Sequence, residues 1–143
     1  MSPVTARPGG TLVLDSEGLA KAVQRDREVT GWLALARADD MRVITSAATL
    51  VEVVHPRIRR AALEWTLSRI VVEAVTEDIA RLAAGLLVGA GLHGHQHAID
   101  AMLAATALAS PGPVTILTSD PDDLRALCDL TAPRNSRVTL IKI

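Results

Sequence analysis

Short apolar runs alternate with longer helix-like segments along almost the whole chain, and this alternation constrains the fold more than any other feature. Each run is rich in Val, Ile, Leu and Thr and is too short for an ordinary helix, so it predicts a buried strand. The segments between the runs carry helix-start residues and apolar side chains at helical spacing. The predicted strands cover residues 11–15, 42–45, 70–75, 114–118 and 137–143.

Helices are predicted between these strands. Ser16, Ser46 and Thr76 are candidate N-caps, and Pro121 suits the first position of a helix. The expected helices cover residues 16–25, 28–37, 46–55, 57–67, 76–89, 98–110 and 119–130. Strands joined by helical crossovers pair in parallel, so the expected fold class is α/β. The sequence therefore predicts a three-layer α/β/α sandwich with a five-stranded parallel sheet.

Length and composition narrow the class of protein. The chain of 143 residues is expected to form a single domain over 1–143, with residues 1–10 as a flexible N-terminal segment. Its net charge of −1 provides no global attraction to nucleic acid or to an anionic membrane. A lone cysteine, Cys128, excludes a disulfide framework and is expected in the core. No apolar run reaches the length of a membrane span and no signal peptide is recognised, so we expect a cytoplasmic protein without a membrane partner.

Acidic residues follow the predicted strands at the sheet edge where parallel α/β proteins bind ligands. Asp15 directly follows the first strand, and Asp120 follows the fourth. Glu52 lies in the helix after the second strand, and Asp100 lies in the first turn of an apolar helix that leads to the fourth. If the first and fourth strands are neighbours, these four carboxylates reach one pocket. Because clustered carboxylates repel one another, such a pocket predicts a divalent cation that can stabilise charge on a phosphodiester.

Each of these acids also has a structural interpretation. Asp15 and Asp120 stand where an N-cap is expected, and Asp122 and Asp123 suit the first turn of the helix that follows. For Asp122 and Asp123 alone we favour that interpretation, whereas for Asp120 the two are balanced and compatible. Carboxylates are almost never buried without a partner, so Asp100 among apolar neighbours favours a functional role.

Four short motifs, in this order, resemble the acidic motifs of PIN-domain proteins, and most of all those of the ribonuclease toxins of VapBC toxin–antitoxin systems. The motifs are "LVLDSEGL", "ATLVEV", "AIDAMLAATAL" and "ILTSDPDDL". The resemblance covers about residues 11–143 and implies a PIN-like fold and cleavage of RNA with Mg²⁺ or Mn²⁺. It also implies a homodimer and inhibition by a cognate antitoxin protein.

The resemblance also implies roles for individual residues. The acids that match the catalytic quartet of the family are Asp15, Glu52, Asp100 and Asp120. All of these except Glu52 are expected metal ligands. Ser16, directly after the first acid, and Thr118, two residues before the last, match small polar positions near the site. Asp122 or Asp123 can share the role of the last acid, and Asp123 is kept as an additional site candidate.

Two surfaces are predicted to meet partners. Arg57, Arg59 and Arg60 follow the Glu52 helix and either form a solvated face or contact the phosphates of RNA. Residues 79–90 carry an apolar helix face that is larger than one small core needs. Together with the resemblance, this face predicts a homodimer.

The stretch "HGHQH" at residues 93–97 is a further group of potential ligands. Its alternating histidines suit a metal softer than Mg²⁺, such as Zn²⁺. The glycines at 91 and 94 favour instead a flexible, solvated loop, which is the structure that we expect here. His97 lies three residues before Asp100, so it can approach the acidic pocket.

The predicted function is that of an enzyme, a Mg²⁺-dependent endoribonuclease that acts as a toxin, and two alternatives stay open. A phosphoryl-transfer domain, either an aspartyl phosphatase or a receiver-like domain, would use Asp15 as phosphate acceptor. A phosphatase of the haloacid-dehalogenase type would want an aspartate at position 17, which is Glu, and no partner lysine is clearly placed. A non-catalytic PIN-like module that binds RNA or a protein would not need four acids. The absence of Phe and Tyr further disfavours a module that holds bases by stacking.

Overall fold

The computed structural model of the chain describes residues 9–129, 132–135 and 137–143; residues 1–8, with most of the expected flexible segment, lie outside these ranges. The described residues form a five-stranded sheet in the order β3-β2-β1-β4-β5, and every neighbouring pair is parallel. The strands are β1 (Thr11–Leu14), β2 (Arg42–Ser46), β3 (Val71–Glu73), β4 (Val114–Thr118) and β5 (Val138–Lys142). Since β1 and β4 are neighbours, the acids that follow them start from adjacent positions.

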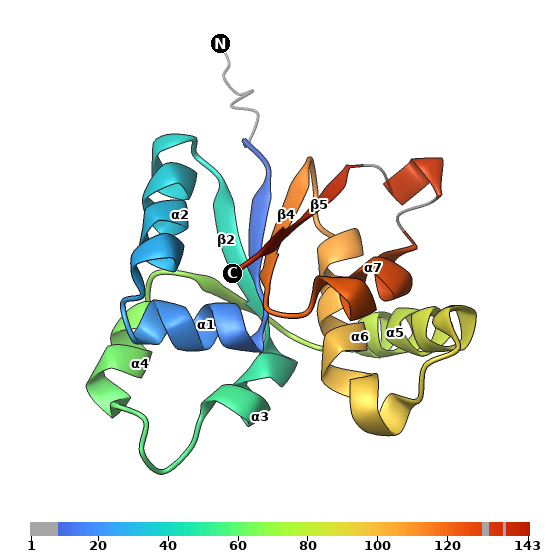
Figure 1. Cartoon of the computed structure of the whole chain (residues 1–143), viewed down its shortest axis with the longest axis horizontal. Coiled ribbons are helices and arrows are strands. Elements are labelled where there is room, and N and C mark those ends of the chain that lie inside the picture. The colour runs from blue at the N-terminus through green and yellow to red at the C-terminus, as the bar shows by residue number, and fades with distance from the viewer. Residues whose placement is uncertain (1–8, 130–131, 136) are drawn as a thin grey trace.

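Helices cover both faces of the sheet. They are α1 (Ser16–Val23), α2 (Arg27–Ala38), α3 (Leu50–Val53), α4 (Arg60–Leu67), α5 (Glu77–Ala90), α6 (Gly94–Leu108) and α7 (Pro121–Cys128). Figure 1 shows α1, α2 and α4 on one side of the sheet and α5, α6 and α7 on the other, which makes the predicted three-layer sandwich. Among the described residues, no helix has the length and apolar character of a membrane span.

Alternate side chains of β1 enter two separate cores. Leu12 and Leu14 are fully buried in the core beneath α1 and α2, whereas Val13 is fully buried in the core beneath α5, α6 and α7. Burial on both faces explains why this strand appears in the sequence as an unbroken apolar run. Cys128 lies in the second core, as predicted, and burial raises the pKa of its thiol to about 11.

A glycine lets β1 begin directly beside β4. Gly10 has a φ of +107°, and a Cβ at this position would lie 2.4 Å from the carbonyl oxygen of Pro113. The next N–H group, that of Thr11, donates a hydrogen bond to the same carbonyl at 2.8 Å. The pairing that begins here continues to Leu14 and Leu117, so the two strands end together at their carboxyl edge.

Two predicted helices begin later or differ in type. In place of one helix over 46–55, a 3₁₀ turn at Ala47–Thr49 precedes the four-residue α3, although Ser46 accepts the expected capping bond from Ala48. The helix predicted from residue 57 begins at Arg60. Its start is delayed because the backbone N–H of Arg57 donates to the His55 imidazole, which holds a local turn around the proline between them.

The expected loop at residues 93–97 is wrong. A left-handed Gly91, with φ of +67°, ends α5, and α6 begins only three residues later at Gly94. The helix then kinks at His97, whose φ of −121° and ψ of 16° are not helical. Residues 98–108 form the predicted apolar helix, with Asp100 in the first turn after the kink.

The apolar face of α5 is partly covered by the core of the same chain. Ile79, Leu86 and Leu87 lie against the core, Ala83 is buried, and Leu82 remains 39% exposed. Since Ala83 alone of this face is buried, the surplus apolar face, which was one reason to expect a homodimer, stays a prediction. The homodimer itself stays a prediction from the family resemblance.

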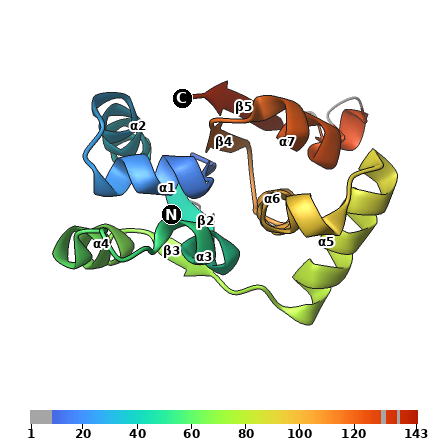
Figure 2. The same cartoon turned by 60° about the horizontal axis from the view of Figure 1, so that its bottom comes forward.

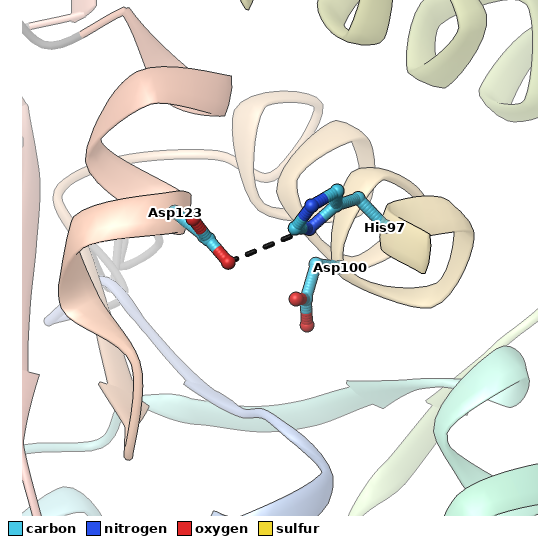
Figure 3. Close-up of side chains that lie close together, drawn as sticks. All are labelled: His97, Asp100 and Asp123. Carbon is cyan, nitrogen blue, oxygen red and sulfur yellow. Dashed lines mark ion pairs between the residues drawn. The ribbon is translucent and has the colours of Figure 1, made fainter. Parts of the chain in front are cut away.

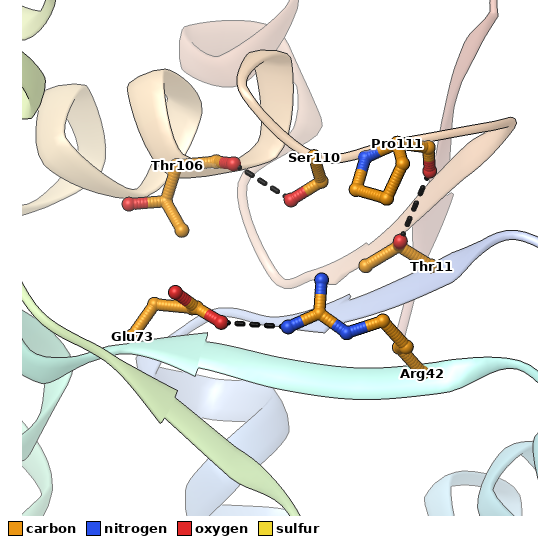
Figure 4. A network of polar contacts seen from close by, with 6 residues as sticks. All are labelled: Thr11, Arg42, Glu73, Thr106, Ser110 and Pro111. Atoms are coloured by element: carbon orange, nitrogen blue, oxygen red, sulfur yellow. Dashed lines mark hydrogen bonds and ion pairs between the residues drawn. The ribbon is translucent and has the colours of Figure 1, made fainter.

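A polar network lies between β2, β3 and the end of α6. Figure 4 shows Arg42 and Glu73, which form an ion pair with 2.7 Å between Nη2 and Oε1. Nearby, the Ser110 hydroxyl donates to the carbonyl oxygen of Thr106 at 2.8 Å. The charged and hydroxyl groups in this region thus have partners within the chain.

Candidate active site

The four predicted acids gather around one open pocket at the carboxyl edge of the sheet. The pocket has a volume of about 1100 Å³, and its lining includes Asp15, Glu52, Asp100 and Asp120. These residues come from the end of β1, from α3, from α6 and from the start of α7. Figure 2 brings this edge forward and shows the start of α1, α3 and α6 around it. The structure thus brings the four side chains together, while their roles in catalysis and metal binding stay predictions.

Asp15 is the most buried of these acids and also caps a helix. Its Oδ1 accepts a hydrogen bond from the Gly18 N–H at 2.7 Å, and its Oδ2 accepts one from the Ser119 N–H at 3.3 Å. Burial raises the pKa of Asp15, and the nearby charge of Glu17 raises it further. The two backbone bonds and a bond with the Thr118 side chain oppose this rise. The capping role and the position in the pocket therefore coexist.

Asp100 has the clearest sign of charge crowding. Its pKa is raised from 3.8 to about 6, first by burial and then by the negative charges of Glu52, Asp15, Asp120 and Asp123. The side chain lies on an otherwise apolar helix and forms no ion pair within the described residues. A carboxylate in this position becomes favourable when a cation shares the site.

Small polar residues hold two of the acids in place. The Ser16 hydroxyl donates to Oε1 of Glu52 at 2.5 Å, which links the start of α1 to α3. Thr118 is buried, its hydroxyl accepts a bond from the Asp120 N–H at 2.9 Å, and its side chain also bonds to Asp15. Asp120 stands at the N-cap position of α7, but its carboxylate makes no capping bond. The capping interpretation of that carboxylate is therefore wrong.

A histidine joins the acids between α6 and α7. Figure 3 shows His97, Asp100 and Asp123, whose potential ligand atoms all lie within 4.8 Å of one another. Nδ1 of His97 is 3.4 Å from Oδ2 of Asp123 and is buried without a hydrogen-bond partner in the part of the chain that the structure describes. Burial, a hydrogen bond with the Asp120 side chain and its negative charge raise the pKa of Asp123, against the effect of His97. The acids at this end of the site therefore also repel one another.

Another part of the pocket wall is cationic. Arg57 and Arg59 line the pocket, and Arg60 does not, although the three were predicted together. Arg25 and Trp65 also line it, and the Arg25 guanidinium lies 5.1 Å from the centre of the Trp65 ring. The pocket therefore combines an acidic group with arginines that can contact an anionic ligand.

Some residues at the pocket were not predicted from the sequence. Ser119 contributes through its backbone N–H, which donates a hydrogen bond to Asp15. Any residue except proline supplies such a group, so the amino-acid type at this position could not predict the contact. Arg25 and Trp65 come from separate segments that only tertiary packing brings to the pocket. Asp122, one alternative for the last acid, is exposed, pairs with Arg125 at 3.2 Å and is not part of the pocket lining.

Comparison with known proteins identifies the fold. No protein-family model and no curated protein matches the chain. The chain is similar to a chain in the crystal structure of VapBC2 from Rickettsia felis bound to a DNA fragment from their promoter. The identity is 17% and the TM-score 0.65, over 93% of this chain and 98% of that chain. A second similar chain occurs in the structure of FitAB bound to IR36 DNA fragment, with 22% identity and a TM-score of 0.57, over 92% and 94% of the two chains.

The chain thus has the PIN-like α/β/α fold that its four acidic motifs predict. VapBC is also the system whose toxin those motifs resemble. At these low identities the likeness concerns the fold alone, and one fold can host several functions. The function therefore has to be argued from the pocket.

Proposed function

We propose that the chain is a metal-dependent endoribonuclease and the toxin of a toxin–antitoxin pair. The observation that carries this proposal is the convergence of acids on Asp100, whose pKa burial and four neighbouring carboxylates raise to about 6. Such crowding opposes folding of the metal-free chain, because like charges repel and burial disfavours a charged group. A bound cation offsets this cost, which explains why the acids are kept together.

The residues around the pocket fit a divalent cation such as Mg²⁺ or Mn²⁺. The proposed ligands are Asp15, Asp100 and Asp120, because hard cations prefer carboxylate oxygens. The Asp15 carboxylate accepts two backbone bonds and bonds to the Thr118 side chain, which leaves a lone pair for an ion. Nδ1 of His97 beside Asp100, which is buried and has no hydrogen-bond partner among residues 9–129, 132–135 and 137–143, also fits a bound positive group. When bound, the ion would supply the positive charge that stabilises a phosphodiester during cleavage.

The chain's own side chains would orient the RNA and the attacking water. Arg57 and Arg59 can hold backbone phosphates through paired N–H groups, which places a phosphodiester in the same pocket as the acids. The bond from Ser16 fixes one oxygen of Glu52. The other oxygen of Glu52 can then accept a proton from the attacking water as a general base.

A protein antitoxin is the proposed partner. The fold neighbours VapBC2 and FitAB and the resemblance to VapBC toxins support this partner. Large apolar side chains are also exposed at and near the pocket, on α3 at Val51 and on α4 at Trp65. Exposed apolar groups beside a polar pocket suit a protein partner that covers it. The homodimer is proposed from the resemblance alone.

Cleavage of RNA by the purified chain tests this proposal. A structured RNA should be cleaved with Mg²⁺ or Mn²⁺, and EDTA should abolish cleavage. Asp100→Asn should reduce the rate about 100-fold or more, because a neutral amide is a poorer ligand for a hard cation than a carboxylate. Asp122→Asn makes the same chemical change at an exposed acid outside the pocket and should leave the rate within about twofold. Cleavage of no RNA with either ion, or full activity of Asp100→Asn, would contradict the proposal.

The phosphoryl-transfer alternative finds less support. Both carboxylate oxygens of Asp15, the residue that would accept phosphate, already accept backbone hydrogen bonds. None of the residues described around the pocket is a lysine that could pair with a phosphoryl group. A non-catalytic binding module would leave the crowding around Asp100 without a purpose.

A further inference from the structure

The imidazole of His97, a potential nitrogen ligand for a metal ion, lies next to the acidic pocket but is not part of its lining. Asp100 lines the pocket, whereas His97 and Asp123 do not. Figure 3 shows these three side chains between α6 and α7, with His97 and Asp123 directed toward each other. Asp100 therefore belongs to two groups, one made of acids and one that contains an imidazole.

The three side chains have the spacing of ligands around one ion. His97 lies at the kink of α6 and Asp100 in the first turn after it, whereas Asp123 comes from the first turn of α7. Their ligand atoms lie within 4.8 Å of one another. Ligands bound at about 2.0–2.2 Å from one ion are at most about 4.4 Å apart. Small side-chain rotations are enough to bring this group around an ion.

A simple ion pair explains this arrangement less well. The distance of 3.4 Å from Nδ1 of His97 to Oδ2 of Asp123 is longer than an ordinary N–H···O hydrogen bond. By contrast, Arg42 and Glu73 approach to 2.7 Å. Nδ1 of His97 is also buried without a hydrogen-bond partner among the described residues. Buried polar atoms are normally paired, so this nitrogen indicates a missing partner.

We infer that His97, Asp100 and Asp123 hold one divalent transition ion, such as Mn²⁺ or Co²⁺, in preference to Mg²⁺. This inference rests on the proposed function, which it deepens by naming the class of ion at Asp100. Imidazole nitrogen is a good ligand for transition ions, whereas Mg²⁺ takes oxygen ligands and dehydrates reluctantly. One nitrogen and two carboxylates should therefore separate the two classes of ion by affinity.

Binding of Co²⁺ and Mg²⁺ to the full-length protein, stripped of metal, tests the inference. The Co²⁺ visible absorption spectrum reports the ligands directly, and Mg²⁺ affinity is measured by competition. His97→Ala should weaken Co²⁺ binding at least tenfold, since loss of even an outer partner of a metal ligand costs about 10–100-fold. Its Mg²⁺ affinity should change less than twofold. His95→Ala, an exposed histidine two residues away, is the matched control and should change neither affinity.

A second variant covers the case in which His97→Ala does not fold, and RNA cleavage separates the metal site from the proposed function. If His97→Ala does not fold, His97→Asn keeps a donor toward Asp123 but is a poor ligand, and the same tenfold loss of Co²⁺ affinity is expected. Co²⁺ affinity within twofold of wild type in the folded variant would overturn the inference. If RNA cleavage depends on Mg²⁺ but the His97 variants bind Co²⁺ as wild type does, the inference is wrong and the proposed function is still supported. If Co²⁺ binding depends on His97 but the protein cleaves RNA with no ion tested, the metal site is supported and the proposed nuclease activity is contradicted.

Discussion

The charges at the pocket and those of the polar network between β2 and β3 are arranged in opposite ways. In the network, Arg42 meets Glu73 at 2.7 Å, so each charge has a counter-charge within the chain. At the pocket, acids crowd around Asp100, and burial together with the neighbouring carboxylates raises its pKa to about 6. Charges that hold this fold together find partners inside the chain. The charges that lack such partners lie where we propose that a ligand binds.

The arginines show the same contrast. Arg137 donates three hydrogen bonds to carbonyl oxygens of residues 108–112, at 2.5 to 2.8 Å, and so closes the end of α6 and the turn before β4. The side chains of Arg57 and Arg59 form no ion pair or hydrogen bond within the described part of the chain, and both line the pocket. Arg137 is thus a structural cation, and the pocket arginines are free to contact an anion.

Removal of the Asp100 charge should stabilise the metal-free protein, and this is the largest change in stability that we expect. The pKa of Asp100 is about 6 in the folded chain against 3.8 ordinarily, so the folded state binds the proton more tightly. Stability should therefore fall as pH rises from about 4 to about 6 and remain lower above that range. The pKa difference corresponds to at most about 3 kcal/mol. Thermal melts in EDTA at pH 7.5 should place Asp100→Asn about 3–10 °C above wild type.

The pH dependence provides the control for this prediction. At pH 4 most of the Asp100 carboxyl is protonated in the folded wild type, so the two proteins should melt at nearly the same temperature. A lower melting temperature of Asp100→Asn at pH 7.5 would show that the carboxylate holds the fold. In that case Asp100 would stabilise the fold as the charges of the Arg42–Glu73 network do, and the contrast between the pocket and the network would be wrong.

Asp15 belongs to both sides of the comparison, since it caps α1 and also lies in the pocket. Asp15→Asn keeps an oxygen that can accept the Gly18 N–H, whereas Asp15→Ala removes it. The Ala variant should therefore be less stable than the Asn variant by about 1 kcal/mol, measured by denaturant unfolding, and neither should cleave RNA. Asp26→Ala is the control, because Asp26 caps α2 through Val29 outside the pocket lining. It should lose similar stability and keep its activity.

Arg57 and Arg60, which were predicted together as an RNA-binding surface, should differ in their contribution to RNA affinity. Arg57→Ala should weaken RNA binding. It should also make the fall of log affinity with log salt concentration less steep by about 0.7, as expected when one phosphate contact to a single strand is lost. Arg60→Ala should change this slope little, because Arg60 is not part of the pocket lining. Filter binding of RNA in EDTA at several salt concentrations measures both. Equal changes in the two variants would mean that the basic surface is not organised by the pocket.

Much of the fold could be predicted because its signals are local. The apolar runs predict the strands, and crossover helices require parallel pairing, which the structure confirms. The placement of Asp15 and Asp120 followed from strand ends once β1 and β4 were taken as neighbours. Asp100 stood out because a single acid in an apolar helix has a cost that local propensity does not explain.

Other features depend on packing that the sequence does not reveal. The glycines near His97 suggested a loop, but a left-handed Gly91 ends α5 sharply and α6 begins only three residues later, at Gly94. The sequence also does not show how much of the apolar face of α5 the core covers, and in the structure only Ala83 of that face is buried. In the same way, only the folded chain shows that Arg57 reaches the pocket.

The smallest predicted effect concerns the Arg42–Glu73 pair itself. Its side chains are 40% and 36% exposed, and ion pairs this accessible to water contribute less than about 1 kcal/mol. Glu73→Gln should therefore lower the melting temperature by no more than a few degrees, and 1 M NaCl should reduce the difference from wild type. RNA cleavage should be unchanged, because Glu73 lies outside the pocket lining.

Glu77→Gln is the matched control for this pair, because Glu77 and Arg81 form an ion pair whose side chains are 76% and 77% exposed. Water screens this pair more strongly, so the variant should melt within error of wild type. The sign is the decisive quantity, since loss of a partnered acid should destabilise and loss of the crowded acid should stabilise. If Glu73→Gln raised the melting temperature as Asp100→Asn is expected to do, removal of any negative charge would stabilise this chain. The crowding at Asp100 would then reflect its overall charge and would no longer mark a ligand site.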